Sequence, residues 1–298
     1  MSDAIFIAEL TKAFGDQFAL DHLSLRVEPG EIFGFLGPNG AGKSSTIRLL
    51  LDLIRPTSGY AEVFGFNCRR QSHEVRARTG YLPGDLRLYT GLTGRELAAL
   101  FARIRGLGQN SEEVERVASK LSLDLDEHVG ALSKANRQKV GVLLALLGQP
   151  PLLLLDEPTS GLDPIVQHAV WDLLRGAAAA GTTVFLSSHV MGEVEQVCRR
   201  VGILRAGRLA AVEPIAALKG KQLRHVEISF GDVAPPERTF APPGVRELRR
   251  DNATVEFEVA GEIDVLIKAV APYRILDLRT EQATLDEVLM SYYRDGAA

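Results

Sequence analysis

The N-terminal part of the chain alternates apolar and polar positions in short runs that predict strands. Three runs show period-two alternation or unbroken apolar character between turn residues, and they cover Ile5–Leu10, Ala19–Val27 and Glu31–Leu36. The third run leads into a glycine-rich segment, Gly37–Gly42, after which a helical pattern covers Lys43–Ile54. We expect this helix to stop where Arg55 meets Pro56, because the residue before a proline avoids the helical conformation.

The apolar spacing becomes helical over the segment Leu86–Gly148. Two stretches of it are amphipathic and bounded by glycine or capping residues, namely Leu92–Gly106 and Ser111–Leu121. Ser133 has the hydroxyl of a good N-cap for a third helix, and Gly148 and Pro150 supply its stop signals. We therefore expect an inserted helical subdomain at about 86–150.

Strands and helices alternate after this block. The predicted elements are a strand at Leu152–Leu155, a helix at Pro164–Ala180, a strand at Thr182–Ser187, a helix at Met191–Arg200, and a hairpin at Val201–Val212 that turns at Ala206 and Gly207. This order predicts an α/β core with a mostly parallel sheet.

The pattern changes again near the C-terminus, where half-buried strands surround one helix. These elements are strands at His225–Phe230, Thr254–Val259 and Arg274–Leu278 and a helix at Ile263–Val270. Thr284 and Glu287 have capping-box spacing before a final helix at Leu285–Tyr293. We expect two domains, 1–220 and a small α+β accessory domain at 221–298.

Composition and charge exclude several classes of protein. The apolar fraction of 46% and the charged fraction of 24% are those of a globular chain, not of a disordered one. The formal net charge of -4 gives no general attraction to nucleic acid, so no nucleic-acid partner is expected. Cys68 and Cys198 lack metal-ligand spacing, which argues against a zinc site or disulfide and fits a reducing cytoplasm.

No segment predicts a membrane span. A spanning helix needs about 20 mostly apolar residues, and the nearest candidate, Val140–Leu155, is interrupted by Gln149, Pro150 and Pro151. The start of the chain, Met1–Phe6, does not have the pattern of a signal peptide. Any membrane role is therefore expected to be exercised through a partner.

The strongest motif is the run Gly37-Pro38-Asn39-Gly40-Ala41-Gly42-Lys43-Ser44, which fits G-x-x-x-x-G-K-[ST] at every required position. Its glycines allow backbone N–H groups to turn toward phosphate, and the helix that follows adds its positive dipole end. We expect this run and Ser45 to bind ATP, with Lys43 on the β- and γ-phosphates and Ser44 on Mg²⁺. The alternative is a glycine-rich turn with an exposed lysine.

A pair of acids ends the apolar strand Leu152–Leu155. Open α/β sheets bind ligands at the carboxyl ends of their strands, which is where Asp156 and Glu157 lie. We expect Asp156 to hold Mg²⁺ and Glu157 to activate the attacking water as a general base. Taken alone, acids at a strand end are more often solvated surface.

A further motif is the run Leu132-Ser133-Lys134-Ala135-Asn136-Arg137-Gln138-Lys139-Val140. It resembles the signature Leu-Ser-Gly-Gly-Gln-Arg-Gln-Arg-Val of the ATP-binding-cassette (ABC) ATPases. Together with the phosphate loop and the acid pair, it makes residues 4–219 similar to that family. The resemblance implies the ABC type of P-loop NTPase fold and adds the switch histidine His189 to Lys43 and Glu157 as catalytic residues.

The resemblance also implies further nucleotide contacts. Phe14 takes the place of the aromatic residue that stacks on adenine, and Ser160–Asp163 matches the D-loop. Ser133 and Ala135 would face the γ-phosphate of ATP held by the opposite subunit. Each has a structural alternative: Phe14 as an ordinary exposed or core aromatic, Asp163 as a cap before Pro164, and Ser133 as a cap in either case.

The match departs from the family at a few positions. Lys134 and Asn136 replace a glycine and a glutamine of the signature, and Ala135 replaces a glycine whose positive φ or close approach a methyl group could obstruct. Gly84 stands where relatives have glutamine or an acid, a residue that touches Mg²⁺ and the attacking water; neighbouring Asp85 is a possible substitute. Despite these departures we expect a working ATPase, and the departures are compatible with slow hydrolysis.

The resemblance implies a function that needs two chains, in a homodimer or a heterodimer with a homologous ATPase. ATP would lie between them, and hydrolysis would drive an integral-membrane permease on another chain, with this chain cytoplasmic and peripheral on the inner face of the membrane. The run Thr284–Leu289 resembles ATPases of the ABC-2-type exporters of drugs and antibiotics. The alternatives are an importer ATPase, a soluble ABC ATPase acting on ribosomes or DNA, and a weakly hydrolysing regulatory subunit.

Overall fold

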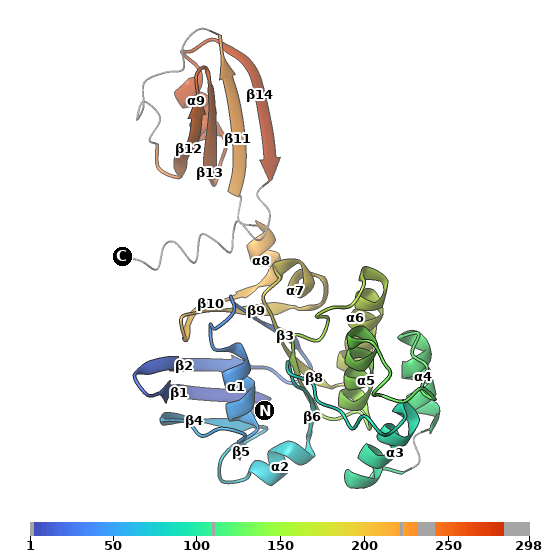
Figure 1. Ribbon diagram of the computed structural model, residues 1–298. Coiled ribbons are helices and arrows are strands. Elements are labelled where there is room, and N and C mark those ends of the chain that lie inside the picture. Colours follow the sequence, from blue (N-terminus) through green and yellow to red (C-terminus); the bar gives the residue numbers. More distant parts are fainter. Residues whose placement is uncertain (1–2, 109–110, 221–222, 232–241, 283–298) are drawn as a thin grey trace. The chain divides into compact units, whose positions relative to one another are not determined.

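The computed structural model describes residues 3–108, 111–220, 223–231 and 242–282 (Figure 1). The chain forms two compact units, Met1–Glu213 and Pro214–Ala298. The domain boundary expected at 220/221 lies at the end of helix α8 (Ile215–Gly220).

The first unit contains an antiparallel sheet of order β2-β1-β4-β5. Its strands are β1 (Ile5–Phe14), β2 (Gln17–Val27), β4 (Ser58–Val63) and β5 (Phe66–Asn67). Strand β1 pairs with both β2 and β4, so that Ile5 lies opposite Val27 on one side and Val63 on the other. This sheet leads the chain to the strand that precedes the phosphate loop.

A second sheet of order β10-β9-β3-β8-β7-β6 forms the centre of the same unit. Its strands are β3 (Ile32–Leu36), β6 (Thr79–Leu82), β7 (Leu152–Asp156), β8 (Thr183–Ser188), β9 (Arg200–Arg205) and β10 (Arg208–Pro214). Neighbouring strands in the part of the sheet ordered β9-β3-β8-β7-β6 pair in parallel. In these pairs Leu36 lies opposite Ser188, and Asp156 lies opposite Ser187. The carboxyl ends of β3, β7 and β8 therefore meet at one edge of the sheet.

Helices cover both faces of this parallel sheet. Their bounds are α1 (Lys43–Leu50), α2 (Ser72–Ala77), α3 (Gly94–Ile104), α4 (Ser111–Lys120), α5 (Lys134–Leu146), α6 (Pro164–Ala179) and α7 (Met191–Val197). Helix α1 packs between the two sheets, since Ile47 and Leu50 share a buried cluster with Ile5 and Phe35. Helices α5 and α6 lie on the other side of the parallel sheet, next to α3 and α4 (Figure 1).

The second unit is a smaller antiparallel sheet of order β12-β13-β11-β14 with one helix on it. Its elements are β11 (Leu223–Phe230), β12 (Val245–Asp251), β13 (Thr254–Ala260), α9 (Asp264–Val270) and β14 (Ile275–Gln282). Alternate residues of β11 and β13, among them Val226 and Phe257, pack with Leu266 and Val270 of α9 into a separate core. The unit is thus α+β, with a hydrophobic core of its own.

The α/β fold with a mostly parallel sheet is confirmed, and the helical stretch predicted before β7 is present as α3, α4 and α5. The first helix is shorter than predicted, because α1 ends at Leu50 and not at Ile54. The predicted final helix, Leu285–Tyr293, lies outside the described residues together with its capping pair. Among the described helices, none combines the length and hydrophobicity that crossing a bilayer requires.

Candidate active site

The phosphate loop lies between β3 and α1, as its motif requires. Two of its glycines lie where a side chain would clash with the backbone of another segment. A Cβ atom at Gly37 would lie 2.5 Å from the carbonyl oxygen of Leu204, and one at Gly42 would lie 2.4 Å from that of Ala19. Gly42 also has φ +111°, a conformation that L side chains rarely adopt. Pro38, Asn39 and Gly40 at the tip of the loop are exposed and Ala41 is buried. The backbone of the loop is thus fixed close to two other segments while its tip is open.

Lys43 at the start of α1 is buried, with only 6% of its surface exposed. Its Nζ donates to the carbonyl oxygens of Gly37 at 2.6 Å and Pro38 at 3.3 Å and lies 3.5 Å from Oε1 of Glu157. The lysine is therefore bonded to carbonyl oxygens of its own loop and forms an ion pair with Glu157, a predicted catalytic residue that follows β7.

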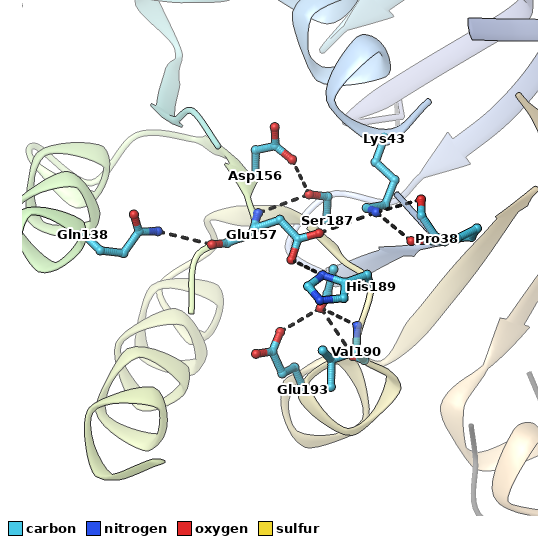
Figure 2. A network of polar contacts seen from close by, with 11 residues as sticks. Pro38, Lys43, Gln138, Asp156, Glu157, Ser187, His189, Val190 and Glu193 are labelled. Carbon is cyan, nitrogen blue, oxygen red and sulfur yellow. Dashed lines mark hydrogen bonds and ion pairs between the residues drawn. The ribbon is translucent and has the colours of Figure 1, made fainter. Parts of the chain in front are cut away.

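Glu157 follows β7 in an unusual backbone conformation. Its φ is +54°, and its N–H donates to both the carbonyl and the hydroxyl oxygen of Ser187, each at 3.2 Å. These bonds hold a conformation that is costly for a residue with a Cβ. Figure 2 shows the consequence: the carboxylate lies between Lys43 and His189, whose Nδ1 is 2.9 Å from Oε2.

His189 comes directly after β8 and is 48% exposed. The neighbouring Ser188 hydroxyl donates to Oε2 of Glu193 at 2.7 Å and accepts from the N–H of Val190 at 3.0 Å. These bonds fix the turn between β8 and α7 on which the histidine stands. The structure thus brings the three predicted catalytic residues, Lys43, Glu157 and His189, into one cluster.

Asp156 and Ser44 are the predicted ligands of Mg²⁺. Asp156 is 3% exposed, and its Oδ1 accepts a hydrogen bond from the Ser187 hydroxyl at 2.6 Å. Within the part of the chain that the structure describes, its Oδ2 makes no hydrogen bond or ion pair. Ser44 and Ser45 are half-buried at the start of α1. A carboxylate oxygen and a hydroxyl suit Mg²⁺, so these residues fit the ion.

No group of three or more His, Cys, Asp or Glu among the described residues could hold a metal.

Gln138 on α5 belongs to the site, although the sequence analysis assigned it no role. Its Nε2 donates to the carbonyl oxygens of Glu157 at 3.2 Å and Pro158 at 3.1 Å (Figure 2). It therefore connects the helical block to the turn that carries Glu157, the predicted general base. Its place in the run that resembles the ABC signature was the only sequence signal.

Ser133 and Ala135 lie at the N-terminus of α5. The Ser133 hydroxyl accepts from the N–H of Asn136 at 3.1 Å, so the predicted cap is present. Ala135 lies inside the helix and is not among the residues with positive φ, so the expected obstruction of a positive φ does not arise. Within the described chain, neither side chain has a hydrogen bond with the cluster around Glu157.

Two other predicted residues are on the surface. Phe14 is 55% exposed, which excludes a core role, and Nζ of Lys12 lies 4.6 Å from the centre of its ring. Asp163 caps α6 by accepting from the N–H groups of Ile165 and Val166, each at 3.1 Å.

The segment after β6 also differs from the family pattern in its contacts. A Cβ at Gly84 would lie 2.9 Å from Oδ2 of Asp156. Asp85 is 70% exposed and accepts from both Nε and Nη2 of Arg87 at 3.2 and 3.0 Å. Its carboxylate is thus held by a surface arginine. Nearby, burial and then the charge of Asp156 raise the pKa of Tyr81.

Comparison with known proteins supports the prediction that the chain binds ATP. The family model described as "ABC transporter" matches residues 20–160. The bacitracin transport ATP-binding protein BcrA of Bacillus licheniformis is 40% identical over 235 residues, which cover 78% of this chain and 76% of that protein. The retinal-specific phospholipid-transporting ATPase ABCA4 of Bos taurus is 34% identical over 316 aligned positions, which cover 98% of this chain but 14% of that protein.

Solved structures show the same fold. An ATP-binding subunit of an ABC transporter has a TM-score of 0.67 and 30% identity, covering 73% of this chain and 92% of its own. The dimeric structure of MJ0796, a bacterial ABC transporter cassette, has a TM-score of 0.65 and 23% identity, covering 71% of this chain and 98% of its own.

Proposed function

Because the chain belongs to the ABC transporter family and is one of its ATP-hydrolysing subunits, we propose that it works as a dimer that powers the export of a small molecule. The small molecule passes through a separate membrane-spanning protein. The observation that carries the proposal is the Glu157 carboxylate, which lies between Lys43 and His189 beside the phosphate loop.

Hydrolysis on this chain begins with an exchange of partners at Lys43. Phosphate oxygens replace the carbonyl oxygens of Gly37 and Pro38 around its ammonium group, and Glu157 is released from its ion pair. An ammonium group binds a negatively charged phosphate oxygen more strongly than a neutral carbonyl oxygen, so binding of ATP favours this exchange. Lys43 then stabilises the negative charge on the transferred phosphoryl group.

The Glu157 carboxylate accepts a proton from the attacking water as the water oxygen bonds to the γ-phosphorus and the bond to ADP breaks. His189 holds the carboxylate through Nδ1 and keeps it directed at the water. Mg²⁺, when held by Ser44, Asp156 and the nucleotide, supplies positive charge to the phosphate oxygens.

The complete site contains residues of a second chain. Ser133 is exposed at the N-terminus of α5, where helix N–H groups attract anions, and within the described residues it makes no hydrogen bond with Lys43, Glu157 or His189 of its own chain. In a dimer, Ser133 and Ala135 of one subunit face the nucleotide of the other, and Asp163 lies at the same interface. The dimeric cassette of MJ0796 supports such an assembly.

The Nod factor export ATP-binding protein I of Cupriavidus metallidurans, which is 33% identical over 87% of this chain and 87% of that protein, supports the assignment to an exporter. An integral-membrane permease on another chain carries the pathway for the small molecule. This subunit then lies on the cytoplasmic face of the cell membrane, bound to the permease, and acts on no nucleic acid.

The proposal is tested by trapping the dimer. In size-exclusion chromatography with MgATP, the Glu157→Gln variant should elute as a dimer, because ATP is bound and not hydrolysed. The same variant with ADP should elute as a monomer. A monomer under both conditions, with ATP binding intact, would contradict the two-chain site.

A further inference from the structure

The segment after β6 leaves little space between Gly84 and Asp156, the predicted metal ligand. Strands β6 and β7 pair in parallel with Leu82 opposite Leu155, so the residues that follow each strand meet at the same sheet edge. There, a Cβ at Gly84 would lie 2.9 Å from Oδ2, 3.2 Å from Cγ and 3.7 Å from Cβ of Asp156. Contacts below 3.0 Å between a Cβ and another heavy atom require one of the two to move.

Position 84 favours glycine because there is little room for a side chain, and not because the backbone has a conformation that only glycine adopts easily. Gly84 does not have a positive φ, so its backbone conformation is one that a residue with a side chain can adopt. Gly91, in the same connection between β6 and α3, also has no positive φ, and a Cβ there would have no atom within 4 Å. Of the two glycines, only Gly84 has a carboxylate where a side chain would begin, so Gly91 serves as its control.

Moving the Asp156 carboxylate away from Gly84 would cost free energy, because the carboxylate is buried and hydrogen-bonded. It is 3% exposed, and its Oδ1 is held by the hydroxyl of Ser187 at 2.6 Å. The same hydroxyl accepts the N–H of Glu157 at 3.2 Å. Displacing the carboxylate would break a bond to a fully buried serine and disturb the backbone of the catalytic glutamate.

We propose that Gly84 is a positioning residue for Mg²⁺. The absence of a side chain leaves room for Oδ2 of Asp156 to face the metal site. This inference rests on the proposed hydrolysis of MgATP. It differs from the family pattern, in which the residue at this position contributes a side chain to the ion and the water.

The test is the Mg²⁺ dependence of nucleotide binding in Gly84→Ala, Gly84→Gln and the matched control Gly91→Ala. Binding of a fluorescent ATP analogue is measured first with EDTA and then across a Mg²⁺ titration. Without Mg²⁺, all three variants should bind like the wild type, because the phosphate loop is unchanged. Both Gly84 variants should need roughly 10–100-fold more Mg²⁺ to reach the midpoint, the usual effect of disturbing a metal ligand's support. Gly91→Ala should match the wild type.

Two outcomes overturn the inference while leaving the proposed function intact. One is an unchanged Mg²⁺ midpoint in Gly84→Ala with normal ATP hydrolysis. The other is a lower midpoint in Gly84→Gln, which would mean that the introduced side chain acts as a ligand. Absence of hydrolysis in the wild type would instead contradict the proposed function.

A double variant covers the case in which Gly84→Ala unfolds more easily. Asp156→Ala removes the carboxylate and makes room for the new methyl group. Gly84→Ala should then cause no further decrease in the thermal midpoint when added to Asp156→Ala. A decrease as large as in the wild-type background would show that the glycine is needed for another contact, and would overturn the inference.

Discussion

At the scale of single residues, the site is a set of short polar contacts between side chains that are distant in sequence. Lys43, Glu157 and His189 come from three different segments and meet because β3, β7 and β8 end at one sheet edge. The geometry depends on bonds to backbone groups as much as on bonds between these side chains.

Gln138→Leu tests one of these supports. It removes the donor that holds the carbonyl oxygens of Glu157 and Pro158. We expect kcat for ATP hydrolysis to fall about tenfold, since loss of a hydrogen bond of ~1.5 kcal/mol has that effect on a transition state. The KM for ATP should change little, because the hydrogen bonds that the Gln138 side chain makes with described residues go to Glu157 and Pro158 and not to the phosphate loop. Exposed Gln196→Leu is the control, and an equal loss there would contradict the positioning role.

The two cysteines make a second prediction at this scale. Burial raises the pKa of the Cys68 thiol to about 12 and raises that of Cys198 as well. Since the thiolate is the reactive form, neither thiol of the native chain should react with a disulfide reagent at pH 8, and both should react after denaturation. Above pH ~9 the unfolded thiols ionise while the folded ones stay protonated, so stability should fall as the pH rises. Rapid labelling of the native chain would contradict this.

At the scale of elements, the parts predicted best were those with a strong local signal. The strand, glycine loop and helix from Ile32 to Leu50 follow from apolar runs and the phosphate-loop pattern. Strand β4 was missed because half of its residues are exposed and Gly59, with φ +73°, lies within it. The contacts of Gln138 and Gly84 could not be predicted, since Gln138 lies within the helical block and Gly84 before it, while Glu157 and Asp156 follow it.

The capping box of α3 gives the prediction at this scale. Thr93 accepts from the N–H of Glu96, and the Glu96 carboxylate accepts from the N–H of Thr93. Thr93→Ala should lower the free energy of unfolding by about 1 kcal/mol. Thr93→Ser keeps the hydroxyl and should cost much less. Urea unfolding followed by circular dichroism measures both, and equal losses would mean that the methyl group matters and the cap does not.

At the scale of the whole molecule, the proposed motor is a pair of chains. Ser133→Arg places a large side chain at the N-terminus of α5, where the second chain's nucleotide is expected. We predict that ATP hydrolysis falls more than tenfold and that the ATP-dependent dimer is lost, while binding of ATP to the single chain stays within about twofold. Ser111→Arg, at the exposed start of α4, is the matched control. Unchanged hydrolysis in Ser133→Arg would argue against a shared site.

The central claim is that Glu157 is the general base of an ATPase, and steady-state hydrolysis of MgATP by Glu157→Gln tests it most directly. We predict that kcat falls by at least roughly 100-fold, the usual contribution of general base catalysis, while ATP still binds. Glu112→Gln, which changes an exposed acid of α4, should hydrolyse ATP at the wild-type rate. Hydrolysis by Glu157→Gln at the rate of the wild type would contradict the account.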